Sequence, residues 1–148
     1  MSGGDVVVDD HLLLRILLGD EPPELRPRGG RIATTGLWYH RLCRALAGSR
    51  VTGALSRLLG GQQALGERAV RSVITLPDEI DLMSLRALAW PMAQLVDDGA
   101  RLNLLSLEAL AAAIDLDAVL CLSTVDENPP LMGAAGVVGV PTRLIRSP

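Results

Sequence analysis

The chain has 148 residues, of which 49 % are hydrophobic, and its formal net charge at pH 7 is −3. A chain of this length is expected to form one domain, residues 1–148, and to bury a core without disulfides. No apolar stretch reaches the roughly 18 residues that a membrane span needs, and no positively charged segment precedes the first apolar run. We therefore expect a cytoplasmic protein without a membrane span or a signal peptide. Cys43 and Cys121 have no metal-type spacing and are expected to be reduced thiols.

Apolar runs and segments of helical periodicity alternate along the chain. In chain order, the pattern predicts a strand at 5–9, a helix at 11–18, a strand at 31–35, a helix at 36–47, a strand at 71–76, a helix from 81 to about 96, a helix from 107 to about 114, a strand at 118–124, a helix at 131–138 and a strand at 141–145. Strands that alternate with helices are typical of a parallel sheet covered on both faces. The predicted fold class is α/β, a three-layer α/β/α sandwich with a central parallel sheet of about five strands.

Two of the predicted helices carry capping signals. Asp81 is the expected N-cap of the helix that runs to about Val96, and Ser106 is the expected N-cap of the alanine-rich helix after it. Pro91 should kink or split the first of these helices, because proline has no N–H to donate. Glu108 falls in the first turn of the second helix, where the helix dipole favours a negative charge.

Three acids stand where a shared site is geometrically reasonable. Asp9 ends the first predicted strand, Glu108 begins a helix, and Asp126 follows the fourth strand. Open parallel sheets bind ligands beyond the carboxyl ends of their strands. Carboxylates suit Mg²⁺ or Mn²⁺, and a carboxylate cluster is costly unless a cation neutralises it. The pattern predicts a metal-dependent phosphoesterase; the alternative is that Asp9 or Asp10 is a plain helix N-cap.

These motifs resemble the PIN-domain family, especially the small VapC-like toxins. The resemblance begins with Val6-Val7-Val8-Asp9 and the apolar helix after it. It continues with Ser106-Leu107-Glu108-Ala109-Leu110-Ala111, which is similar to the Asp-Ala-Leu helix start of the family. It closes with Leu122-Ser123-Thr124-Val125-Asp126, which is similar to the family's apolar strand ending in Thr-x-Asp, and with residues 131–140, which resemble the helix and Gly-Val turn before the last strand. Order and spacing agree over almost the whole chain.

The resemblance implies an α/β/α sandwich that binds magnesium, or manganese in its place, through its acids and cuts RNA. It also implies a homodimer that an antitoxin protein silences. Carried onto this sequence, it assigns catalysis and metal ligation to Asp9, Glu108 and Asp126. It gives Thr124 the role of orienting the metal site.

The sequence departs from the family pattern in two places. The family has a Glu at the start of the helix after its second strand, whereas here no acid follows residue 34 before Glu67. The Asp of the third position is replaced by the longer Glu108. Candidates for the missing ligand are Asp10, Asp115 and Asp117. The sequence therefore leaves open both an active and a degenerate nuclease.

Positive charge is concentrated between residues 26 and 71. Nine arginines there face one acid, Glu67, so this segment carries +8 and the remainder of the chain carries −11. Arginine makes bidentate contacts to phosphates. Within the segment, His40, Arg41 and Arg44 fall on one side of a predicted helix and are the candidate RNA-binding residues. The alternative is a solvated face that neutralises the acidic remainder.

Three functions are compatible with the sequence. The first is a toxin-type endoribonuclease that uses Mg²⁺ or Mn²⁺, and the second is a degenerate PIN-like domain that binds RNA or a partner protein. The third is a small α/β protein that binds an unrelated ligand at the same edge of the sheet. The leucine-rich region Leu82–Leu95 favours a homodimer, because a chain this small carries more apolar surface than one core buries.

Overall fold

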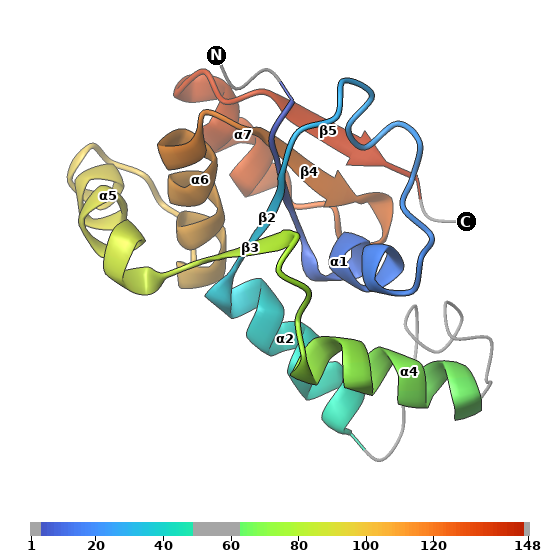
Figure 1. Ribbon diagram of the computed structural model, residues 1–148. Coiled ribbons are helices and arrows are strands. Elements are labelled where there is room, and N and C mark those ends of the chain that lie inside the picture. Colours follow the sequence, from blue (N-terminus) through green and yellow to red (C-terminus); the bar gives the residue numbers. More distant parts are fainter. Residues whose placement is uncertain (1–3, 49–62, 147–148) are drawn as a thin grey trace.

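A five-stranded parallel sheet forms the centre of the computed structural model, which describes residues 4–48 and 63–146 (Figure 1). The strand order is β3-β2-β1-β4-β5, and each neighbouring pair is parallel. The strands are β1 (Val6–Val8), β2 (Ile32–Thr35), β3 (Ile80–Met83), β4 (Val119–Ser123) and β5 (Thr142–Ile145). The predicted parallel sheet is therefore confirmed.

Helices cover both faces of this sheet. They are α1 (Asp10–Leu17), α2 (Gly36–Ala47), α4 (Gln63–Ile74), α5 (Leu85–Asp97), α6 (Leu104–Leu116) and α7 (Pro129–Val137), with a short 3₁₀ helix η1 (Thr124–Asp126) after β4. Val6 and Val8 pack in one core with side chains of α1, α2 and α4, whereas Val7 packs in a second core with α5, α6 and α7. Successive side chains of a strand point to opposite faces, so one apolar run supplies both cores. The predicted three-layer sandwich is confirmed.

The third strand was predicted in the wrong place. Residues 71–74 end helix α4, in which Ala69 and Val73, four positions apart, are buried against α1 and α2, and residues 75 and 76 follow that helix. The observed third strand, β3, lies at the edge of the sheet, and only its residue Ile80 is buried. An edge strand of four residues with one buried side chain has no clear apolar pattern in its sequence. The β-branched residues at the end of α4, by contrast, are of the type that is enriched in strands.

Both predicted N-caps were wrong for the same reason. Asp81 lies within β3, where its carboxylate receives two hydrogen bonds from Arg31, and Ser84 caps α5 instead. Helix α6 begins one turn before Ser106, because the Asn103 side chain accepts a hydrogen bond from the Ser106 N–H. Helix α5 is not split, since it continues past Pro91. Several polar residues stood near each boundary, and only the packing of the helices selected one of them.

The chain order of the strands places a topological switch point at β1. Strand β1 pairs with β2 on one side and with β4 on the other. The helix after β1 covers one face, and the helices that precede and follow β4 cover the other. In open α/β sheets, ligands bind beyond the carboxyl ends of the strands at such a switch point. Asp9 and Asp126 follow these strand ends.

Neither thiol is part of a disulfide. Cys43 is half-buried and Cys121 is buried in β4. Burial raises the pKa of Cys121 to about 12, so this thiol stays protonated at neutral pH. Within the described ranges, no helix is long and apolar enough to cross a membrane.

Candidate functional site

Asp9 joins the carboxyl ends of β1 and β4. It is the N-cap of α1, and its Oδ1 accepts a hydrogen bond from the Leu12 N–H at 2.9 Å. Its Oδ2 accepts one from the Ser123 N–H at 2.8 Å. The side chain is buried, and this burial raises the pKa of Asp9 to about 6, against the lowering effect of the two backbone hydrogen bonds. Asp9 is therefore both a helix cap and part of a group of acids at this edge of the sheet. We call this group, Asp9, Asp10, Glu108 and Asp126, the acidic edge.

Arg41 holds two further acids together. Its Nε donates to Asp10 Oδ2 at 2.7 Å, and its Nη2 donates to Asp10 Oδ1 at 2.6 Å. The same Nη2 donates to Asp126 Oδ2 at 2.6 Å. Hydrogen bonding to Asp10 raises the pKa of the Arg41 guanidinium, which is a permanent cation at this position. Helix α2 thus delivers a positive charge to the ends of β1 and β4.

Glu108 reaches the same region from α6. It lies in the second turn of that helix, and its carboxylate is buried. Its Oε1 accepts a hydrogen bond from the Leu37 N–H at 2.8 Å, in the first turn of α2. The prediction that Glu108 complements the dipole of its own helix was therefore wrong: it stabilises the amino terminus of a neighbouring helix.

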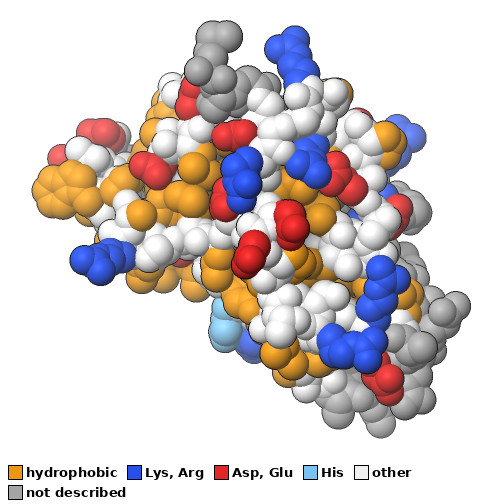
Figure 2. Space-filling model, in the orientation of Figure 1, with side chains coloured by type: hydrophobic (Ala, Val, Ile, Leu, Met, Phe, Trp, Pro, Cys, Tyr) orange, Lys and Arg blue, Asp and Glu red, His pale blue; other side chains and the backbone are white. Residues whose placement is uncertain are grey.

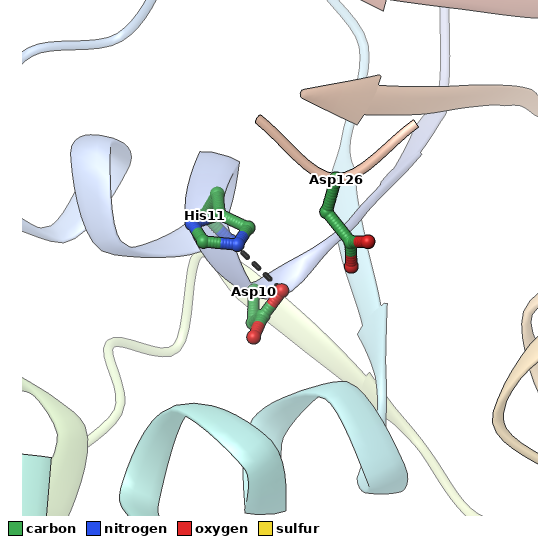
Figure 3. A group of neighbouring side chains, drawn as sticks. All are labelled: Asp10, His11 and Asp126. Carbon is green, nitrogen blue, oxygen red and sulfur yellow. Dashed lines mark hydrogen bonds between the residues drawn. The ribbon is translucent and has the colours of Figure 1, made fainter. Parts of the chain in front are cut away.

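One group of possible metal ligands shares Asp126 with the predicted set. In the described part of the chain, Asp10, His11 and Asp126 form a group in which each offers one ligand atom and these atoms lie within 4.8 Å of one another. Figure 3 shows Asp10 and Asp126 facing each other across the end of the sheet, with His11 beside them and its backbone N–H bonded to Asp10. Asp9 and Glu108 belong to the same edge but lie outside this group. Their assignment as metal ligands stays a prediction.

Part of this arrangement was predictable from the sequence. Asp10 is one of the candidates to replace the missing acid, and the structure buries it at the edge of the sheet. The other two candidates, Asp115 and Asp117, are exposed near the end of α6, at the amino end of β4. Nothing near Arg41 in the sequence indicates its pairing, because its two partners are 31 and 85 residues away.

The chemistry of this donor set fits a divalent cation. Carboxylate oxygens suit Mg²⁺, and a combination of carboxylate and imidazole suits Mn²⁺. Asp10 is nearly buried, with 7 % of its side chain exposed, whereas Asp126 has 43 % exposed and opens the group to solvent. A cation therefore has a route to the group, but two of its three donors are hydrogen-bonded to Arg41.

The candidate RNA-binding residues lie in two environments. His40 and Arg44 are exposed on α2, whereas Arg41 is half-buried among the acids. Trp38 is buried in the core beneath this helix. Thr124 begins η1, two residues before Asp126, and its proposed role in orienting a metal site stays a prediction. Arg50 and Arg57, which belong to the predicted basic segment, lie outside the described residues.

Comparison with solved structures identifies the class of fold. No model of a protein family matches the chain, and no curated protein sequence is similar to it. The 2.2 Å structure of VapBC-1 from nontypeable Haemophilus influenzae matches with a TM-score of 0.54 and 13 % sequence identity, over 94 % of this chain and 96 % of that chain. The chain therefore has a PIN-like fold. The similarity to a VapBC-1 structure agrees with the VapC-like fold that the sequence motifs predicted.

Proposed function

We propose that this protein is a toxin-type endoribonuclease that hydrolyses RNA phosphodiester bonds with the help of Mg²⁺ or Mn²⁺. One observation supports it above the others. Asp10 and Asp126 are far apart in the sequence, yet the PIN-like fold places their carboxylates, with His11, close enough to share an ion. They lie at the switch point of the sheet, where α/β proteins bind their ligands.

The proposed metal ligands are Asp9, Glu108 and Asp126, with Asp10 as the replacement for the missing acid and Thr124 as the residue that orients the site. A bound Mg²⁺ or Mn²⁺ supplies an activated water and stabilises negative charge on the phosphate. The protein itself holds the acidic side chains in position. Backbone hydrogen bonds fix both oxygens of Asp9, and Glu108 ties α6 to the start of α2. RNA would approach along α2, where His40 and Arg44 are exposed.

Metal-dependent cleavage of RNA tests this proposal. The purified protein is incubated with a fluorescently labelled single-stranded RNA in Mn²⁺, Mg²⁺ or EDTA. We expect cleavage in Mn²⁺ or Mg²⁺ and none in EDTA. We expect the cleavage rate of Asp126→Asn to be lower by about 100-fold or more, in line with the loss of one charge-stabilising group. Glu127→Gln is the matched control, since Glu127 is the exposed neighbour of Asp126 and should leave the rate unchanged. Cleavage that persists in EDTA or in Asp126→Asn contradicts the proposal.

A second candidate function is favoured by the pairing of Arg41. Because Arg41 already pairs with both Asp10 and Asp126 and offsets one of their two charges, the fold has less need of a metal at this edge. A non-catalytic PIN-like domain that binds RNA or a partner protein would have the same ion pairs at this edge. Its signature in the cleavage experiment is salt-dependent RNA binding that survives Asp126→Asn, with no cleavage in any metal.

We further propose that the protein is a cytoplasmic homodimer that pairs with an antitoxin, as the VapBC-1 name of the similar structure suggests. Figure 2 shows hydrophobic side chains at the surface over α5. Large apolar side chains are exposed around α5, the start of α6 and the end of α7: Leu82, Leu85, Trp90, Val96, Leu104, Val137 and Val138. An exposed patch of this kind is typical of a protein–protein interface.

Substitution of Trp90 tests the dimer. Its side chain is 73 % exposed, and aromatic anchors contribute most of the energy of many interfaces. We expect Trp90→Ser to weaken self-association by about 30-fold or more. Size-exclusion chromatography with light scattering should then show a dimer for the unmodified protein and a monomer for the variant at the same micromolar concentration. Ile74→Ser is the control, because Ile74 is equally exposed but lies on α4. A monomer before substitution contradicts the proposal.

A further inference from the structure

Arg41 occupies the centre of the acidic group. Its Nη2 is 2.6 Å from an oxygen of Asp10 and 2.6 Å from an oxygen of Asp126, and its Nε takes the remaining oxygen of Asp10. Every oxygen of Asp10 is therefore hydrogen-bonded to the guanidinium. His11 lies beside the same two acids, with a ring nitrogen within 4.8 Å of an oxygen of each, and its backbone N–H donates to Asp10.

The charges explain why a cation is needed there. Two carboxylates whose oxygens lie within 4.8 Å repel each other, and Asp10 has little contact with water. Such a pair is costly unless a positive charge lies beside it. Arg41 supplies one positive charge, whereas a divalent ion would supply two. A divalent ion at Asp10 would need an oxygen that Arg41 already occupies, and the guanidinium beside it would repel it.

Arg41 is able to leave this position. Its side chain comes from the exposed side of α2 and is 38 % exposed, and Asp126 is 43 % exposed. The long side chain can therefore turn into solvent without moving the buried core that α2 forms with α1. The structure thus holds a cation that is bound strongly but is not enclosed.

We infer that Arg41 is the built-in cation of the acidic edge, and that a divalent ion binds Asp10 and Asp126 only by displacing it. This inference rests on the part of the proposed function in which the edge takes a metal, but it does not require that RNA is cut. Arg41 then sets the concentration of metal at which the site fills. The protein with Arg41 in place binds metal weakly.

Manganese binding to the full chain tests the inference. Free Mn²⁺ is followed by electron paramagnetic resonance during titration of the unmodified protein and of Arg41→Met, with thermal unfolding as a second readout. We expect Arg41→Met to bind Mn²⁺ about tenfold more tightly or better, and to gain more thermal stability from it, because two carboxylates are released and a like charge is removed. Arg44→Met, on the exposed side of α2, should bind Mn²⁺ as the unmodified protein does.

The controls separate the possible failures. Equal affinity in Arg41→Met and the unmodified protein overturns the inference but leaves a metal site. No binding in either protein overturns both the inference and the metal in the proposed function. Adding Asp126→Asn to Arg41→Met should remove the gained affinity, and a gain that persists also overturns the inference. If Arg41→Met does not fold, Arg41→Lys is used, because it keeps one charge but loses the bidentate contact. Arg41→Lys is then expected to bind Mn²⁺ more tightly than the unmodified protein, and equal affinity overturns the inference.

Discussion

Replacing Arg41 with methionine is expected to lower the free energy of unfolding by about 3 kcal/mol at pH 7 without metal, the low end of the range for breaking a buried ion pair. The reason is the burial of Asp10. Its side chain is 7 % exposed and loses both of its charged hydrogen bonds, whereas water partly screens the half-exposed Arg41. Methionine fills most of the volume of the arginine stem, so the loss measures charge and not packing.

A double substitution separates these contributions. When Asp10→Asn is combined with Arg41→Met, the buried side chain at position 10 carries no charge, and Asp126, with 43 % of its side chain exposed, keeps its contact with water. We therefore expect most of the lost stability to return. Urea unfolding of the unmodified protein, both single variants and the double variant gives the four free energies. Arg44→Met should change stability by less than about 0.5 kcal/mol, as surface substitutions do. If Arg41→Met costs less than about 1 kcal/mol, the ion pair does not hold the edge together.

A fall in stability from pH 4 to pH 7 that depends on Asp9 is the second expected result. In the folded protein the pKa of Asp9 is raised to about 6 because the carboxyl is buried, and its ordinary value is 3.8. A group with a raised folded pKa contributes stability that is fully present below the unfolded pKa and is lost as pH rises through the folded value. The window is therefore pH 4 to pH 6, and the change is roughly 3 kcal/mol, at 1.36 kcal/mol for each pH unit of difference.

Neutral caps isolate this contribution. Asp9→Asn and Asp9→Ser keep an oxygen that can accept from the Leu12 N–H, but neither titrates in this range. Urea unfolding in EDTA at pH 4, 5, 6 and 7 gives the difference in stability between each variant and the unmodified protein. Between pH 4 and pH 7, we expect the free energy of unfolding of both variants to rise by roughly 3 kcal/mol relative to that of the unmodified protein. A difference that stays constant over this range means that burial of Asp9 does not govern its charge.

The sequence was sufficient for the parts of the fold that depend on local pattern. Strands β1 and β4 appeared as apolar runs because both of their faces are buried, and α2 was predicted with its observed bounds, 36–47. Asp9 was placed correctly at the end of a strand, since that position follows from the order of residues along the chain. A fully buried strand appears as a continuous apolar run, and a helix appears as apolar residues three or four positions apart, so both can be predicted from the local sequence.

The elements that were wrong are those in which tertiary contacts overrode local preference. Val73 and Ile74 belong to α4, because Val73 packs together with Ala69 against residues of α1 and α2 that lie earlier in the chain. Strand β3 exists because its backbone pairs with β2 and because Asp81 bonds to Arg31, 50 residues earlier. Neither contact is visible within a window of ten or fifteen residues.

The acidic edge shows the same division. The order of residues alone determined that acids follow the ends of β1 and β4, and an open parallel sheet brings such ends together. Only the tertiary structure decided that Glu108 caps α2 and that Arg41 lies between Asp10 and Asp126. These contacts join residues between 31 and 85 positions apart. Charge pairing across such distances depends on how helices pack against the sheet, and nothing in the neighbouring sequence encodes it.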